Sequence, residues 1–241
     1  MPILTTQSPV GEWAAASPDA IRLFERHGFN YCCGGHKPLA IACREAGVDP
    51  QTLIDELARS ATVATAERDW SAASLAELCD HIERTHHRFL REQLPHIARL
   101  LDAVIASHSA QHPELREVGA VFAELRGELE PHMMKEERIL FPAIRTLEQS
   151  VLPPMFPFGS VRNPIGMMEH EHDQAGEGLQ RLRELTRDYA VPAGACTKYR
   201  ALLDALDRLE ADLHVHIHKE NNILFPRAAE LEGSAVATNE W

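Results

Sequence analysis

A short sequence that combines a histidine with a glutamate four residues later occurs twice in this chain. The first copy is His132-Met-Met-Lys-Glu136, which continues to Ile139-Leu-Phe-Pro142. The second copy is His216-Ile-His-Lys-Glu220, which continues to Ile223-Leu-Phe-Pro226. Residues four apart lie on the same face of a helix. Each copy therefore places an imidazole beside a carboxylate, and such a pair can bind a metal ion.

The residues around each pair predict that it faces a protein core. Apolar residues recur at steps of three and four, which is the pattern of a buried helix face. Around the first pair they are Val118, Phe122, Leu125, Leu129, Ile139 and Ala143. Around the second they are Leu202, Leu206, Leu209, Leu213 and Ile223. A buried hydrogen bond between His and Glu would explain one such pair, but two copies in one register favour a metal site.

The third and first helical patterns add two more histidines to this face. His172 lies on a stripe with Ile165, Met168, Ala175, Leu179 and Leu182. In the earlier pattern His86 continues the stripe from Ile82, whereas His87 begins the stripe that contains Leu90. The intervals between the histidines leave both alternatives open, and we favour His87 because its stripe is longer. The off-stripe histidines are expected to lie in solvent; these are His81, His86, His170, His214 and His218.

The predicted ligand set consists of four imidazoles and two carboxylates: His87, His132, His172, His216, Glu136 and Glu220. Helical bundles build dinuclear metal sites from inward-facing residues of this kind. A set of nitrogen and oxygen donors without thiolate suits iron or manganese, and it is too large for one tetrahedral zinc. Glu136 and Glu220 can each bridge two ions. The remaining positions are open to an oxo or hydroxo group, water or a small gas.

The elements that must position these residues are four long helices. The first is expected from Ser71 or Ser74 to about His108, with a kink at Pro95. The others are expected at about residues 114–148, 163–189 and 196–231. Short connections between three of the four predict an antiparallel bundle over residues 71–231. With no strand pattern in the sequence, the predicted fold is all-α.

Residues 1–62 are expected to form a separate small helical domain. Ser17-Pro18-Asp19 is a helix start, and that helix is expected to end near Gly28. Pro38 and Pro50 are expected to begin two further short helices. The polar stretch from Ala64 to Trp70 is predicted to be the linker to the bundle.

Two adjacent cysteines in this small domain allow two interpretations. Cys32 and Cys33 are followed by two glycines, which permit a close approach of the backbone to another group. Adjacent cysteines close only a strained ring, so a disulfide there would be easily reduced. The pair is either two small residues in a tight turn or an exposed dithiol that is redox-active or hands over metal. The other cysteines, Cys43, Cys79 and Cys196, are expected to be packing residues.

Composition and charge exclude several classes of partner. The chain has 241 residues, 44% of them hydrophobic, which is enough for one large or two unequal domains with a core. Its net charge of -12 opposes binding to nucleic acid or to an anionic membrane. No apolar run approaches the roughly 20 residues of a membrane span. Five cysteines are a sparse, odd set that favours reduced thiols, so we expect a cytoplasmic protein.

Together these motifs resemble the bacterial repair of iron centres family, in which a short domain with Tyr-Cys-Cys-Gly-Gly precedes a hemerythrin-like di-iron bundle. The resemblance covers nearly the whole chain. Its specific parts are Asn30-Tyr-Cys-Cys-Gly-Gly35, Arg91-Glu-Gln-Leu-Pro95, His132-Met-Met-Lys-Glu-Glu137, Glu171-His-Asp173 and Glu220-Asn-Asn-Ile-Leu-Phe-Pro-Arg-Ala228. In the family pattern the first ligand histidine lies four residues before the arginine, which is His87 here. The other ligands carry over to the set that the stripes select.

The resemblance implies a cytoplasmic protein with two non-haem irons, often a homodimer, that repairs iron–sulfur clusters damaged by nitric oxide or oxidants. Its partners would be damaged iron–sulfur proteins or apo-acceptors, and small gases such as nitric oxide and oxygen. Three mechanisms remain open: iron donation through Cys32 and Cys33, reduction of nitric oxide, or non-catalytic sensing of oxygen or nitric oxide. A sensor has no need of the cysteine domain, so the sequence favours the first two.

Three further features of the sequence concern a carboxylate beside a predicted ligand, a departure from the family pattern and a long apolar interval. Glu171, next to His172, is either a surface carboxylate or part of the route by which protons or iron enter the bundle, and we favour the route. Asn30 stands where the family usually has aspartate. The interval 148–162 is longer and more apolar than the family pattern, and its role is open.

Overall fold

A computed structural model describes residues 4–60, 70–151 and 154–237, and in these residues every regular element is helical. Two isolated backbone bridges, Pro9 to Pro38 and Phe156 to Gly159, are the extent of β pairing there. The all-α class predicted from the sequence is therefore confirmed. The predicted linker lies, apart from Trp70, outside the described residues. Within the described parts, no helix is both long and apolar enough to cross a membrane.

The contacts divide the chain into two compact units. The first comprises Met1–Leu78, Leu147–Pro154 and His214–Trp241, and the second comprises Cys79–Thr146 and Met155–Leu213. The two domains predicted from the sequence, residues 1–62 and 71–231, stay a prediction.

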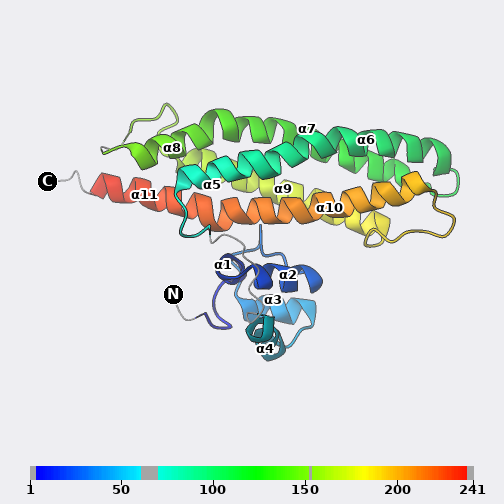
Figure 1. Ribbon diagram of the computed structural model, residues 1–241, viewed down its shortest axis with the longest axis horizontal. Helices are drawn as coiled ribbons and strands as arrows, with labels where there is room; N and C mark the ends of the chain where they lie inside the picture. The colour runs from blue at the N-terminus through cyan, green and yellow to red at the C-terminus, as the bar shows by residue number, and fades with distance from the viewer. Residues whose placement is uncertain (1–3, 61–69, 152–153, 238–241) are drawn as a thin grey trace. The chain divides into compact units, whose positions relative to one another are not determined.

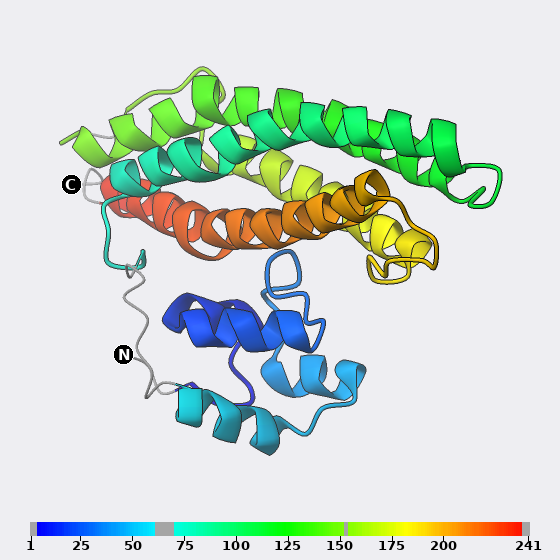
Figure 2. The same cartoon turned by 45° about the vertical axis from the view of Figure 1, so that its right-hand side comes forward.

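The N-terminal part of the first unit is a group of short helices: α1 (Val10–Ala16), α2 (Pro18–Arg26), α3 (Leu39–Ala46) and α4 (Pro50–Ser60) (Figure 2). The predicted start of α2 is confirmed, because the Ser17 side chain accepts a hydrogen bond of 3.2 Å from the backbone amide of Asp19. Gly47 ends α3 in the left-handed conformation, with φ 68°. The predicted starts near Pro38 and Pro50 are likewise confirmed, whereas α1 was not predicted.

The second unit is a bundle of long helices (Figure 1): α6 (Arg88–His108), α7 (Leu115–Lys135), α9 (Arg162–Thr186) and α10 (Thr197–Lys219), which belongs to this unit as far as Leu213. Its core contains the predicted apolar stripes, including Leu90, Val118, Phe122, Leu125, Leu129, Leu179, Leu182, Leu202, Leu206, Leu209 and Leu213. Each fully buried side chain of this size contributes about 1.5–3 kcal/mol. Burial of these stripes, rather than the polar pairs between them, therefore holds the bundle together.

Three π-helical turns interrupt the long helices. They are η1 (Glu83–His87) between α5 (Leu75–Ile82) and α6, η2 (Glu136–Leu140) between α7 and α8 (Phe141–Gln149), and η3 (Glu220–Leu224) between α10 and α11 (Phe225–Ala237). A π turn adds one residue to the helical repeat and commonly lies at a functional site. None of these turns was predicted from the sequence. The predicted kink at Pro95 stays a prediction, and α6 continues across that residue.

The turn η2 changes which residues face the core after Glu136. Ile139, predicted to be buried, is 47% exposed, and this prediction was wrong. Because the π turn inserts one residue, Leu140 and Phe141 occupy the buried positions instead. The second copy makes the same shift at η3, where Leu224 and Phe225 are buried, but Ile223 is buried there as well, so its predicted burial is confirmed.

The apolar interval between α8 and α9 makes local contacts with itself in its described part, residues 150–151 and 154–161. The rings of Phe156 and Phe158 stack with centroids 5.1 Å apart. The Asn163 side-chain amide donates a hydrogen bond of 2.8 Å to the backbone oxygen of Phe158. Val151 and Met155 are almost fully exposed. These contacts define a local turn.

Candidate metal centre

Helix ends and π turns position the predicted ligands. His87 is the last residue of η1, while Glu136 and Glu220 are the first residues of η2 and η3. His132 and His216 lie in the last turns of α7 and α10. The sixth residue, His172, lies within α9. All six side chains are at most 3% exposed, so each predicted ligand lies in the protein interior.

His132 is the centre of one set of contacts. Its Nε2 lies 3.3 Å from Oε2 of Glu136 and 3.1 Å from Nε2 of His172. The two imidazole rings are tilted, with centroids 4.8 Å apart. Two ring nitrogens at this distance repel each other unless a proton or a cation lies between them. The pair is therefore suited to binding a cation.

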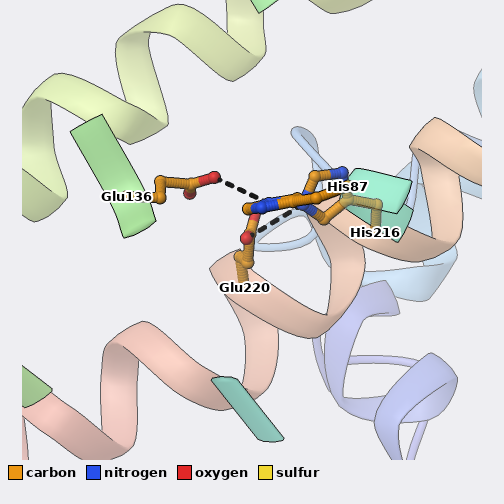
Figure 3. A group of neighbouring side chains, drawn as sticks. All are labelled: His87, Glu136, His216 and Glu220. Atoms are coloured by element: carbon orange, nitrogen blue, oxygen red, sulfur yellow. Dashed lines mark hydrogen bonds and ion pairs between the residues drawn. The ribbon is translucent and has the colours of Figure 1, made fainter. Parts of the chain in front are cut away.

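The remaining ligands converge in the same manner. Nε2 of His87 lies 3.2 Å from Oε2 of Glu136, and Nε2 of His216 lies 3.0 Å from Oε1 of Glu220. Figure 3 shows these four side chains turned toward one another.

Among the described residues, two groups of donor atoms lie close enough to hold a metal ion. In each group the donor atoms are all within 4.8 Å of one another. One group is His87, Glu136, His216 and Glu220, and the other is His132, Glu136, His172 and Glu220. Both groups contain Glu136 and Glu220.

This donor set fits a pair of metal ions. Buried carboxylates are costly unless a positive group neutralises them, and both glutamates are fully buried. Two carboxylates shared between two groups provide the bridging ligands that two ions require. The donors are imidazole nitrogens and carboxylate oxygens, which suit iron or manganese better than a single tetrahedral zinc.

Two further carboxylates orient the ligand imidazoles. Nδ1 of His87 lies 2.7 Å from Glu137, and Nδ1 of His132 lies 2.8 Å from Glu171. A carboxylate only accepts hydrogen bonds, so each Nδ1 carries the hydrogen and donates the hydrogen bond. Each Nε2 then keeps a lone pair directed toward the other metal donors. Glu137 was not among the predicted site residues, although it follows Glu136 directly and ends the family motif His132-Met-Met-Lys-Glu-Glu137.

A cation accompanies each of these outer carboxylates. Arg91 forms an ion pair with Glu137, and Lys135 forms one with Glu171. Burial opposes ionisation of Glu137, but hydrogen bonds from Arg91 and His87 keep its pKa below the usual value. The hydrogen bond from His132 lowers the pKa of Glu171 against the effect of burial, and Lys135 lowers it further. Both groups therefore carry the negative charge that strengthens a histidine ligand.

The contacts of Glu171 bear on the role predicted for it. Its side chain is 21% exposed and bonds to the inner residue His132 and to Lys135, so it is not a simple surface carboxylate. Its place in a route for protons or iron stays a prediction, whereas its contact with a ligand imidazole is observed.

We expect Glu137→Ala and Glu171→Ala each to weaken metal binding by about 10–100-fold, the usual effect of removing a group that orients a ligand. Competition with a coloured chelator measures this affinity. Glu177→Ala on the exposed face of α9 is the matched control and should leave the affinity unchanged. Native affinity in both outer variants would show that these carboxylates do not support the ligands.

The Cys32–Cys33 turn is organised by Asn30. Oδ1 of Asn30 accepts hydrogen bonds from the backbone amides of Cys33 and Gly34, at 3.1 and 2.9 Å, and from the thiol of Cys32 at 3.5 Å. The two sulfurs are 3.8 Å apart, and neither forms a disulfide bond. Cys33 is partly exposed, but Cys32 is buried in the apolar core of this region, so the expected exposure of the dithiol was wrong for Cys32.

The other cysteines differ in their surroundings. Cys43 and Cys79 are fully buried, which confirms that they are packing residues. Cys196 is exposed, and its sulfur lies 3.2 Å from Nε2 of His108, so the same expectation was wrong for this residue. Backbone amides at the start of α10 and the contact with His108 lower the pKa of the Cys196 thiol.

Two of the histidines expected in solvent are buried. His86 is 3% exposed, and its Nδ1 lies 3.0 Å from Asp212, because η1 turns both His86 and His87 inward. His218 is 2% exposed and lies edge-on to the ring of Tyr31, and burial lowers its pKa to about 4. The expectation of solvent was therefore wrong for both residues.

The helical bundle and its buried donors define the class, a hemerythrin-like cation-binding protein. Residues 79–228 match the family described as Hemerythrin HHE cation binding domain. Residues 6–61 match ScdA_N, described as a Domain of Unknown function (DUF542). The hemerythrin-like domain implies binding of non-haem di-iron.

Comparison with individual proteins narrows this class. The chain is 40% identical over 220 residues to the Iron-sulfur cluster repair protein YtfE of Edwardsiella ictaluri (strain 93-146), a match that covers 91% of this chain and 96% of that protein. It is 38% identical, with the same coverage, to proteins of the same name from Escherichia coli O6:K15:H31 and Shigella boydii serotype 4. The chain belongs to the family of these hemerythrin-like YtfE proteins, which confirms the resemblance carried by its motifs.

Proposed function

We propose that this protein holds two iron ions and supplies iron for the repair of damaged iron–sulfur clusters. The observation that carries the proposal is that two groups of buried donors share Glu136 and Glu220. The similar YtfE proteins are named for iron–sulfur cluster repair, which supports the same role for this chain. Iron bound by these donors would be a source of the iron that rebuilding a damaged cluster requires.

The proposed ligand assignment follows the two donor groups. One ion would be held by His87 and His216, and the other by His132 and His172. Glu136 and Glu220 belong to both groups, so they would be shared between the two ions, together with an oxo or hydroxo group. When bound, the pair supplies exchangeable iron and one-electron redox chemistry. The chain's own outer groups, Glu137 and Glu171, hold the imidazoles in the orientation that binding requires.

Cys32 and Cys33 are the proposed transfer thiols. Two adjacent thiolates bind a soft or borderline metal but do not complete a closed site with four ligands, so iron held there remains easy to release. Cys33, the more exposed of the two, is the thiol that an acceptor reaches first. The acceptor is a damaged iron–sulfur protein or its apo form, and the proposed setting is the reducing cytoplasm, where free thiols persist.

A labelled-iron experiment separates donation from its alternatives. Reduced protein loaded anaerobically with isotopically labelled iron is mixed with an iron–sulfur protein damaged by nitric oxide, and nitrous oxide is followed in parallel. We expect the label to enter the acceptor's rebuilt cluster. Catalytic nitrous oxide production without transfer of label would instead identify a nitric oxide reductase. Gas binding without either result would identify a sensor.

A further inference from the structure

Within the first unit, the side chain of Asn222 in η3 contacts the backbone of the Cys32–Cys33 turn. Its Nδ2 lies 3.1 Å from the carbonyl oxygen of Tyr31 and 3.4 Å from that of Cys32. It also lies 3.0 Å from Nδ1 of His218. An amide nitrogen only donates hydrogen bonds, so these three acceptors determine which way the amide faces.

Gly11 and Gly35 pack closely against the oxygen of this amide, Oδ1 of Asn222. A Cβ atom on Gly11 would lie 2.2 Å from Oδ1 of Asn222, and one on Gly35 would lie 2.3 Å from it. The backbone amide of Gly11 donates a hydrogen bond of 2.8 Å to the carbonyl of Gly35, which holds the two glycines together. The close backbone approach expected after the cysteines is therefore an approach to Asn222, and glycine is the residue that permits it.

Packing around Asn222 strengthens this connection. The ring of Tyr31 lies edge-on to His214 and His218, with centroids 6.1 and 5.6 Å away. Ile217 is buried in the same apolar cluster as Tyr31 and Cys32. The turn is therefore held to this end of α10 by apolar burial as well as by the Asn222 amide.

Asn222 also shares a helical turn with a proposed metal ligand. Glu220 is the first residue of η3 and Asn222 is the third. The backbone amide of Phe225 closes this turn on the carbonyl of Glu220. If the backbone at Glu220 becomes more or less ordered, the backbone at Asn222 is therefore expected to change with it, because both residues belong to the same short hydrogen-bonded turn.

We infer that Asn222 is a positioning residue that couples metal occupancy at Glu220 to the conformation of the Cys32–Cys33 turn, and thereby regulates the reactivity of the two thiols. The inference rests on the proposed function, because Glu220 is a proposed ligand and the thiols are the proposed transfer groups. Metal binding orders η3, and Asn222 transmits that order to the turn and keeps Cys32 buried. Loss of metal loosens η3 and makes the thiols accessible.

Site-resolved alkylation tests this coupling. The full chain, metal-free or loaded anaerobically with ferrous iron, is treated with iodoacetamide, and labelling of Cys32 and Cys33 is followed by peptide mass spectrometry. In the native chain we expect slower labelling after loading. In Asn222→Ala we expect Cys32 of the loaded protein to react about tenfold faster, which corresponds to the loss of one or two ordinary hydrogen bonds. Loading should then have no further effect on the rate.

A second variant reaches the same contact from the opposite side. Gly11→Ala places a methyl group against the Asn222 amide, while alanine is the better helix former and does not weaken α1. It should reproduce the faster labelling, so the test does not depend on Asn222→Ala folding well. Asn163→Ala, which removes an amide-to-carbonyl hydrogen bond elsewhere, is the matched control and should label at the native rate.

The outcomes separate this inference from the proposed function. Native labelling rates in both Asn222→Ala and Gly11→Ala would overturn the coupling while leaving iron donation intact. The same holds if loading still slows labelling in Asn222→Ala, because iron would then be protecting the thiols directly. Failure of labelled iron to reach an acceptor would overturn donation whatever the alkylation rates.

Discussion

Changing both Cys32 and Cys33 to alanine is expected to abolish iron–sulfur cluster repair while about two irons remain bound per chain. Neither group of metal donors contains a cysteine, so the bundle keeps its ligands. The turn itself should also persist, because the backbone amides of Cys33 and Gly34 still donate to Asn30. Elemental analysis measures the iron, and recovery of a damaged acceptor's cluster measures repair.

The matched control for this prediction is Cys196→Ala, which removes an exposed thiol outside the turn. It should leave both iron content and repair unchanged. Alkylation of the native protein should reduce repair, whereas a reversible thiol cap should inhibit only until it is removed. Full repair activity in the Cys32→Ala, Cys33→Ala variant would defeat transfer through the thiols and assign all of the chemistry to the bundle.

Replacing Glu136 or Glu220 by leucine is expected to remove bound iron without unfolding the bundle. Both carboxylates are fully buried on otherwise apolar helix faces, so leucine suits each position once no metal charge needs pairing. Replacement of a buried ion pair by well-packed apolar groups is often neutral or stabilising, by about 1–4 kcal/mol, and the partners left here are imidazoles, which leave no unpaired charge in their neutral form. Iron content should therefore fall from about two per chain toward zero, because each glutamate belongs to both donor groups.

Helicity and melting temperature are the measurements that complete this prediction. The metal-free variants should match the metal-free native chain in far-ultraviolet circular dichroism and should melt at the same temperature or higher. Glu177→Leu on the exposed face of α9 is the control for a surface glutamate and should retain iron. Loss of helicity in both buried-site variants would indicate that the carboxylates are structural, and one zinc without iron in the native chain would contradict the di-iron assignment.

The sequence by itself determined the helices and the inward direction of the repeated motif. Burial of apolar side chains at helical spacing is a local property, so the stripes through Phe122 and Leu206 predicted the bundle core correctly. The same periodicity placed His132 and His216 in the interior. Capping is equally local, which is why the start of α2 at Ser17 was predicted.

The tertiary structure decided which residues follow that spacing and which depart from it. A π turn inserts one residue and so interrupts the regular helical spacing, and for this reason the shift that exposes Ile139 and buries both His86 and His87 was not visible in the periodicity. The contacts of His87 with Glu137 and of His132 with Glu171 join different helices.

The contact between Asn222 and the Cys32 turn was even less accessible from the sequence, since it joins residues 190 positions apart. Spacing along the chain specifies which side chains share a face of one helix, because the helical repeat is set by local backbone geometry. It does not specify which side chain of another element meets them, because that depends on how the elements pack together.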